Sequence, residues 1–155
     1  MSERDVIQRI FDEFGKIAGC SKKSGSWYMR GPETIVVLNI QKSQYGHQYF
    51  VNLAIWLRAL GDADAPKENK CHIRTRLTRL VPTDLEERLT ALLDLDRDLD
   101  EVTREEELLR LLCGHLLPLL KASLSLESLP SGDGRRLVAR SLVTGPAQQL
   151  LVPVS

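Results

Sequence analysis

Thr34 to Lys42 has the sequence TIVVLNIQK and Gln48 to Arg58 has the sequence QYFVNLAIWLR, and these two stretches decide the fold. Both are rich in β-branched and aromatic residues, which is typical of strands. Only residues 43–47 separate them, so the two strands are expected to pair antiparallel. Two further strands are predicted, Ser26–Arg30 (SWYMR) before them and Cys71–Leu80 (CHIRTRLTRL) after them. The short connections between the first three favour an antiparallel meander of four strands in all.

A first helix is predicted from apolar residues that recur at three- and four-residue spacing. These residues are Val6, Ile7, Ile10, Phe11, Phe14 and Ile17. Ser2 can cap the start of this helix, and Gly19 can end it. One apolar helix face therefore precedes the first strand.

The second half of the chain changes to a helical period. Thr83 to Glu86 (TDLE) is a capping-box signature. The leucines of residues 85–93 form one helix face, and those of residues 108–120 mark a longer apolar helix. Pro118 is expected to kink the longer helix near Gly114. The end of the chain, residues 135–155, is ambiguous between a last strand, a short helix and a loose end.

These elements predict an α+β domain in which helices pack on one face of a mainly antiparallel four-stranded sheet. A chain of 155 residues favours a single domain over residues 1–155. Within it we expect a helix and a sheet over residues 1–82, a helical part over 83–128 and an unassigned tail over 129–155. Residues 1–82 hold 13 Lys and Arg against 8 Asp and Glu, and the remaining residues hold 8 against 13. The charge pattern therefore fits a basic sheet half and an acidic helical half.

The composition excludes several classes of protein. No apolar run approaches the ~20 residues of a membrane span, and the charged N-terminus shows no secretory signal. Cys20, Cys71 and Cys113 are an odd number without a Cys-x-x-Cys pair, which excludes a disulfide framework and a zinc ribbon. We therefore expect a cytoplasmic protein with no cofactor and no membrane partner. Zero net charge and the lack of an RNA-binding signature argue against nucleic acid as a partner.

The strands predict one polar face on the sheet, because side chains two residues apart share a side. His72, Arg74 and Arg76 share a side of the fourth strand. Asn39 and Asn52 are amides inside otherwise apolar strands, and a buried amide must find hydrogen bonds or face water. The ligand-binding site expected on this face comprises Gln41, Lys42, Asn52, His72, Arg74 and Arg76. The two arginines are suited to hold a carboxylate or a phosphate.

We expect this face to bind a protein partner or a small anionic ligand, so that the chain is a binding or interaction module. Two interpretations compete with this one. The arginines can lie on a solvated sheet face, paired with the acidic helices. Alternatively, His72 can act as general acid or base in a small hydrolase or phosphoryl-handling enzyme. A deep cleft with His72 at its floor would favour the enzyme, and a flat exposed face would favour the binder.

A calcium-modulated protein is a third alternative. The ligand spacing of a calcium loop is matched, between two predicted helices, by Asp94, Asp96, Asp98, Asp100 and Glu105. Leu99 stands where such a loop has its glycine, and Glu101 stands where it has an aliphatic residue. Acidic residues are also favourable at a helix N-terminus without any ion.

Other patterns that carry chemistry find little support in the sequence, and no catalytic residue is assigned. His47 lies near Ser43 with no evident third member of a triad. Cys113 and His115 are two apart on a predicted helix, so they do not face the same side. Phosphate-binding glycine loops and the His-Glu-x-x-His zinc motif are absent from the sequence.

Several stretches of the sheet half resemble a bacterial family. They are Gly25–Arg30 (GSWYMR), Asn39–Gly46 (NIQKSQYG), Tyr49–Leu53 (YFVNL) and Cys71–Leu77 (CHIRTRL). Together they are similar to the family catalogued as domain of unknown function 4304, over about residues 3–125. The resemblance implies a small cytoplasmic α+β domain without an established activity or ligand, and an association with bacterial toxin–immunity neighbourhoods. The leucine-rich tail after Ser125 departs from the family pattern.

Overall fold

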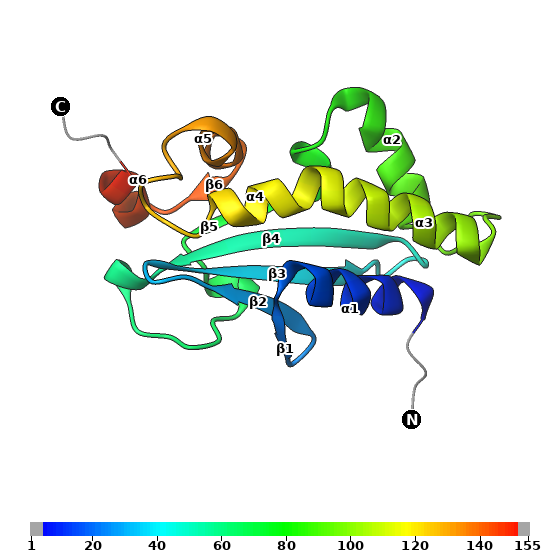
Figure 1. Ribbon diagram of the computed structural model, residues 1–155, viewed down its shortest axis with the longest axis horizontal. Helices are drawn as coiled ribbons and strands as arrows, with labels where there is room; N and C mark the ends of the chain where they lie inside the picture. The colour runs from blue at the N-terminus through cyan, green and yellow to red at the C-terminus, as the bar shows by residue number, and fades with distance from the viewer. Residues whose placement is uncertain (1–4, 152–155) are drawn as a thin grey trace.

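The computed structural model describes residues 5–151 and contains one open antiparallel sheet. Its six strands follow one another in chain order (Figure 1). They are β1 (Ser21–Lys23), β2 (Ser26–Arg30), β3 (Thr34–Lys42), β4 (Tyr49–Leu57), β5 (Ile73–Arg76) and β6 (Leu142–Val143). The α+β class and the antiparallel pairing are therefore confirmed, but the prediction of four strands is wrong. The two additional strands form the sheet edges and are too short for an alternating pattern to reveal them.

The first helix, α1 (Val6–Ala18), forms where it is predicted, although its cap differs. The Asp5 carboxylate accepts a hydrogen bond from the Gln8 backbone N–H, and the Gln8 side chain accepts one from the Asp5 N–H. This capping box satisfies amide groups that a helix leaves free at its start. Ser2, the predicted cap, lies outside the described residues. Gly19 ends the helix in the left-handed conformation (φ 78°), as predicted.

The alternation of side chains divides the sheet into two unlike faces. Val36 and Leu38 of β3 and Leu53 and Ile55 of β4 belong to the main apolar core, together with the inner sides of the helices. All four are at most 1% exposed, and each such burial stabilises the fold by about 1.5–3 kcal/mol. Figure 1 shows α1, α3 and α4 lying across this side of the strands. The helices therefore pack on one face of the sheet, as predicted.

A loop over residues 61–70 covers part of the opposite face. The hydroxyl of Tyr28 donates to the carbonyl of Pro66 (3.1 Å), and the indole N–H of Trp56 donates to the carbonyl of Gly61 (3.0 Å). These bonds hold the loop over a second, smaller apolar cluster. Each aromatic side chain thus buries its ring and still satisfies its polar group.

Strand β5 is shorter than predicted. The alternating sequence of residues 71–80 predicts a strand throughout, but β5 ends at Arg76 and a single 3₁₀ turn, η3 (Leu77–Arg79), follows. Leu77 and Leu80 are both buried, at a spacing of three residues that suits a 3₁₀ turn. Burial of these two leucines overrides the alternating pattern.

The helical half packs a long, interrupted helix across the sheet (Figure 1). Its elements are α2 (Thr83–Leu92), α3 (Glu101–Leu111), a π-helical turn η4 (Leu112–Leu116) and α4 (Leu117–Ala122). Where the sequence predicts a kink near Gly114, the structure has this π turn. Pro118 lies in the first turn of α4, where it cannot donate to the carbonyl of Gly114, and the wider winding accommodates its ring. No helix among residues 5–151 is long and apolar enough to cross a membrane.

The tail that the sequence leaves unassigned is part of the fold as far as residue 151. Helices α5 (Gly132–Ala139) and α6 (Gly145–Leu151) flank β6, which pairs with β5. Leu129, Leu137 and Ala147 are buried in the main core. The tail thus contains both the short strand and the short helix that the sequence allows as alternatives. Residues 152–155 lie outside the described part of the chain.

Gly15 of α1 allows the packing of this helix to be tested. A Cβ atom there would lie 2.6 Å from Cδ1 of Trp27, a side chain that is itself buried. Alanine gains about 1 kcal/mol of helix propensity over glycine, but overpacking a buried site costs about 1–3 kcal/mol. We therefore expect Gly15→Ala to lower the free energy of unfolding by about 1 kcal/mol, measured by urea denaturation. Gly114→Ala is the matched control, because its Cβ meets no atom within 4 Å; a stabilising effect of both changes would contradict this packing.

Candidate functional site

A row of polar side chains crosses four strands on the face opposite the helices. It follows the strand register, in which Ser26 is opposite Asn39, Asn39 is opposite Asn52, and Asn52 is opposite Arg76. Hydrogen bonds link each pair: Asn39 Nδ2 donates to Ser26 Oγ (3.2 Å), Asn52 Nδ2 to Asn39 Oδ1 (3.3 Å) and Arg76 Nε to Asn52 Oδ1 (3.3 Å). We call these four residues the polar ladder. Because its amides find partners in one another, their burial carries little penalty.

The polar ladder holds Arg76 in a defined position. Its Nε donates to Asn52, and its guanidinium carbon lies 4.5 Å from the centre of the Phe50 ring. Asn52 is held in turn by Gln41, whose Oε1 accepts from Asn52 Nδ2 (3.2 Å). Arg76 is exposed, so its two terminal nitrogens are available in a fixed plane. That geometry suits a carboxylate or a phosphate, which can accept two parallel hydrogen bonds.

Arg74, two residues earlier on the same face, is already paired. Its Nε and Nη2 donate to the two carboxylate oxygens of Glu68 (3.1 and 3.4 Å). Glu68 begins η2 (Glu68–Lys70), a short 3₁₀ turn in the covering loop, so the pair ties this loop to β5. The two charges cancel, and Arg74 therefore adds little net charge to its surroundings.

These side chains surround an open hollow of about 260 Å³ beside β5. We call it the arginine hollow; its lining residues are Gln41, Asn52, Glu68, Arg74, Thr75, Arg76, Arg79 and Leu142. Among residues 5–151, no carboxylate forms an ion pair with Arg76 or Arg79. The hollow thus carries two uncompensated positive charges and has room for a small anionic group.

The structure brings together four of the six predicted site residues in the arginine hollow: Gln41, Asn52, Arg74 and Arg76. The inclusion of Lys42 is wrong. Its ammonium lies 5.8 Å from the centre of the Tyr49 ring, and Tyr49 belongs to the core under the helices. Consecutive residues of a strand point to opposite faces, so Lys42 cannot share a side with Gln41.

His72 shares the polar face but does not line the arginine hollow. Its Nδ1 accepts a hydrogen bond from the Leu57 N–H (2.9 Å), and its ring centre lies 4.4 Å from that of Trp56. Burial lowers the pKa of His72 below its ordinary value. The imidazole is therefore neutral at pH 7 and carries its proton on Nε2. Its position gives no support to the alternative in which His72 forms the floor of a catalytic cleft.

The comparison with protein families gives one match. A family model described as Domain of unknown function (DUF4304) matches residues 13–122, which is well over half of the chain. The chain belongs to this family. The DUF4304 match runs from within α1 to the end of α4, so it includes Asn52, Arg76 and Arg79 but not Leu142. Neither the curated proteins nor the solved structures contain a match to the chain.

The acidic stretch of this DUF4304 protein does not assemble a calcium site. Asp94 accepts from the Asp96 N–H, Asp96 pairs with His47 (2.7 Å), and Asp100 caps α3 through the Thr103 N–H. Among residues 5–151, no three His, Cys, Asp or Glu side chains converge as a metal site requires. The structure therefore does not bring together the carboxylates of the calcium alternative, Asp94, Asp96, Asp98, Asp100 and Glu105.

A buried arginine supplies a positive charge to this acidic connection instead. Arg104 of α3 is 2% exposed, and its Nη1 donates to the carbonyls of Leu92 (2.5 Å) and Asp94 (3.1 Å). Its Nη2 donates to the carbonyl of Arg97 (3.1 Å). The Leu92 carbonyl lies at the C-terminal end of α2, whereas the carbonyls of Asp94 and Arg97 also accept from the backbone N–H groups of Arg97 and Leu99. The sequence gives no sign of this role, because most arginines are exposed.

Two other groups that could carry chemistry are not activated. Ser43 Oγ accepts from the Tyr45 N–H, and Nδ1 of His47 pairs with Asp96, so His47 makes no hydrogen bond to Ser43 within the described residues. Burial raises the pKa of the Cys71 thiol to about 12, and the nearby Glu68 carboxylate adds to the rise. Neither side chain is therefore prepared as a nucleophile at neutral pH.

Sequence reasoning missed four residues of the arginine hollow, which are Glu68, Thr75, Arg79 and Leu142. Strand alternation places Arg79 with Ile73 on the helix side, but the 3₁₀ turn η3 rotates it into the hollow. The spacing of three between Leu77 and Leu80 is the signal that could have revealed this turn. Glu68 and Leu142 lie in a polar loop and a two-residue strand, where no periodicity indicates a direction.

The environment of His72 predicts a specific pH dependence. Because its pKa is lowered in the folded protein, unfolded chains bind a proton below pH ~6.5 that folded chains do not. This contribution to stability is therefore present above pH ~6.5 and is lost as pH falls. When the pH is lowered from 7.5 to 5.5, we expect the free energy of unfolding of His72→Asn to decrease less than that of the wild type. Urea denaturation at each pH measures this difference. The asparagine Oδ1 can still accept the Leu57 bond without titrating. His115→Asn, at a half-buried position of η4, should keep the wild-type dependence, and an unchanged dependence in His72→Asn would refute this assignment.

The role of Arg104 can be tested by an apolar replacement of similar length. Arg104→Met removes the donors to four carbonyls, those of Ala91, Leu92, Asp94 and Arg97. We expect the free energy of unfolding to fall by about 2 kcal/mol, since a hydrogen bond to a charged group contributes about 1.5–3 kcal/mol and the carbonyls of Asp94 and Arg97 keep their backbone donors. Arg110→Met, at an exposed position of the same helix, should change it by less than about 0.5 kcal/mol. Equal effects of the two changes in urea denaturation would show that the carbonyl contacts contribute nothing.

Proposed function

We propose that this DUF4304 protein is a binding module, and not an enzyme, that holds an anionic group of its partner in the arginine hollow. The main support is the state of two guanidinium groups. Arg76 is held by Asn52 and Phe50, and neither Arg76 nor Arg79 has a carboxylate partner among residues 5–151. An arginine that is fixed but uncompensated loses little side-chain freedom when it binds an anion.

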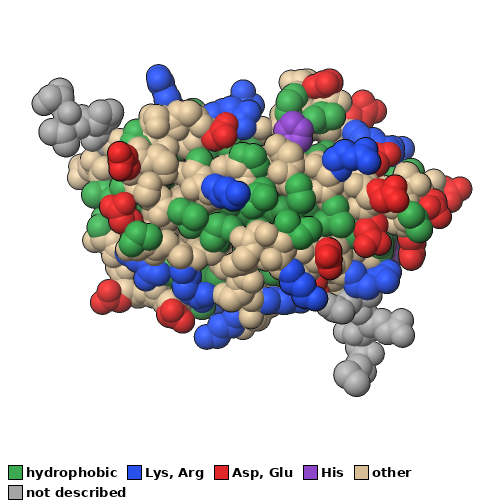
Figure 2. Space-filling model, in the orientation of Figure 1, with side chains coloured by type: hydrophobic (Ala, Val, Ile, Leu, Met, Phe, Trp, Pro, Cys, Tyr) green, Lys and Arg blue, Asp and Glu red, His purple; other side chains and the backbone are tan. Residues whose placement is uncertain are grey.

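The size and charge of the arginine hollow favour the end of a side chain over a whole cofactor. Its volume of about 260 Å³ is below the ~300–1,000 Å³ of pockets that enclose drug-sized ligands. With Arg74 and Glu68 cancelling, Arg76 and Arg79 leave two positive charges, which match a carboxylate or a phosphate. In Figure 2, Lys and Arg side chains gather along the lower side of the molecule, and Asp and Glu gather at its right-hand end. This separation of charge would orient an acidic partner towards one side.

We propose that the partner is a protein and that the two bind in a reducing cytoplasm. Cys20, Cys71 and Cys113 are free, which fits that compartment. A toxin neutralised by its immunity protein is a partner of the kind that the family resemblance implies, and an acidic patch on it would meet the arginine hollow. Co-purification of the product of an adjacent toxin gene with the wild type, but not with Arg76→Glu, would support this partner; equal recovery with both proteins would exclude the hollow as its binding site.

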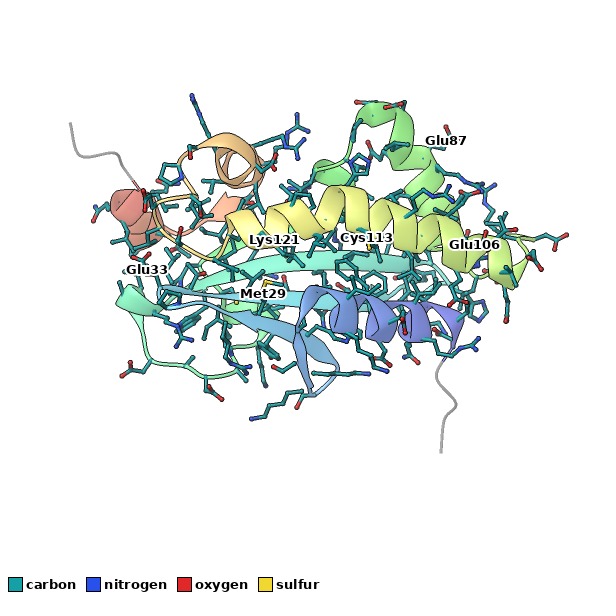
Figure 3. The ribbon with its side chains drawn as sticks, in the orientation of Figure 1. Met29, Glu33, Glu87, Glu106, Cys113 and Lys121 are labelled. Atoms are coloured by element: carbon teal, nitrogen blue, oxygen red, sulfur yellow. The ribbon has the colours of Figure 1, made fainter. Side chains whose placement is uncertain are left out.

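Binding of a defined acidic probe tests the proposed function directly. We expect fluorescein-labelled tetraglutamate to bind the wild type at low salt, in fluorescence anisotropy, and to bind Arg76→Glu about tenfold more weakly. The reason is that an attractive pair is replaced by a repulsive one. Lys121→Glu changes the net charge equally, but Lys121 is an exposed residue of α4 in the helix layer (Figure 3). Its affinity should stay within about twofold of the wild type.

Two outcomes would count against the proposed function. One is the absence of any binding by the wild type. The other is an equal loss in Arg76→Glu and Lys121→Glu, which would mean that only the overall charge attracts the probe. Circular dichroism of both variants controls for folding.

A further inference from the structure

A second hollow, of about 500 Å³, adjoins the arginine hollow. Arg79 lines both hollows, so the two meet at this side chain. The second hollow lies between η3 and α2 on one side and the end of α5 on the other; Thr83, Glu86, Arg140 and Ser141 are among its lining residues. Together the two hollows form a groove that starts beside β5 and continues towards α5. We call it the arginine groove.

Arg140, at the C-terminal cap of α5, is fixed against the same strand as Arg76. Its Nη1 donates to the carbonyl of Arg79 (2.9 Å), and its own carbonyl accepts from the Thr75 hydroxyl (2.8 Å). Among residues 5–151, no carboxylate forms an ion pair with Arg140. Arg76, Arg79 and Arg140 therefore provide three uncompensated cations along one groove.

The third cation comes from outside the family match. Residues 13–122 match the family model, whereas Arg140 and Leu142 belong to the tail that follows. Leu142 is 68% exposed at the sheet edge and lines the arginine hollow. The tail of this chain therefore contributes both a charged and an apolar side chain to the groove.

We infer that the arginine groove binds an extended acidic segment of a partner protein, and that Arg140 extends the recognised segment beyond the arginine hollow. This inference rests on the proposed function, because it takes the arginine hollow as the first part of the binding surface. A single carboxylate or phosphate would occupy that hollow alone and leave the second one empty. In an extended chain, side chains on one side repeat every ~6.6 Å, so acidic residues at alternate positions can meet successive arginines.

The two carboxylates of the groove restrict where the acidic side chains of the partner can lie. Glu68 is neutralised by Arg74, but Glu86 of α2 is exposed in the second hollow. An acidic segment is therefore attracted to the side formed by Arg79 and Arg140 and repelled by the side formed by α2. Glu86→Gln should strengthen the binding of a long acidic probe.

The experiment compares three labelled peptides by fluorescence anisotropy at low salt. They are tetraglutamate, octaglutamate, and tetraglutamate extended by four Gly and Ser residues, which controls for length. On the wild type we expect octaglutamate to bind about tenfold more tightly than either of the other peptides. In Arg140→Ala this advantage should fall by about three- to fivefold, while the affinity for tetraglutamate stays the same. Octaglutamate can bind in more registers than tetraglutamate, which raises its apparent affinity. This statistical advantage is the same on the wild type and on Arg140→Ala, so it does not affect the comparison of the two proteins.

Arg135→Ala is the matched control, because Arg135 is an exposed residue of α5 and does not line the second hollow. It should retain the octaglutamate advantage of the wild type. An equal loss in Arg135→Ala and Arg140→Ala, or no loss in Arg140→Ala, would overturn the inference while leaving the proposed function intact. If tetraglutamate itself fails to bind the wild type, that result contradicts the proposed function, on which the inference rests.

Discussion

The pairing of Asn39 with Asn52 is the constraint on which the sheet depends. A shift of one residue between β3 and β4 would turn one of these amides towards the helices and a core leucine towards the polar face. The cost would combine lost apolar burial with about 1–3 kcal/mol for each amide left without a partner. The register that buries Leu38 opposite Leu53 is therefore also the one that completes the polar ladder. It fixes Arg76 as a consequence, since that side chain forms the last member of the ladder.

The location of the binding surface follows from how the two faces are covered. Helices cover one face, and the bonds of Tyr28 and Trp56 hold a loop over the apolar part of the other. The same loop ends near Glu68, which pairs with Arg74 at the margin of the arginine hollow. The polar end of this face carries Arg76, which is left exposed by both the helices and the loop. The covering elements thus define the hollow as much as its own side chains do.

Regular periodicity accounts for what the sequence could predict. The long strands β3 and β4, the helix α1 and the shared side of Gln41, Asn52, Arg74 and Arg76 all follow from spacing and alternation. The grouping of Lys42 with them contradicted that same alternation. The remaining differences depend on contacts between distant residues: the 3₁₀ turn that redirects Arg79, the two-residue strand β6, and the burial of Arg104 under backbone carbonyls. Apart from the spacing of Leu77 and Leu80 that marks the 3₁₀ turn, no local pattern encodes these contacts.

The π turn at Leu112–Leu116 determines which side of α4 meets the sheet. A π turn closes its hydrogen bonds one residue further along than an α-helix does, so it holds an extra residue. In a continuous α-helix without that residue, every later side chain would be rotated by about 100° around the axis. Leu119 and Leu120, now fully buried, would then point away from the strands. The extra residue sets the rotation of α4 about its axis, so that its leucines face the sheet. The number of residues in this helix is therefore constrained as strictly as their apolar character.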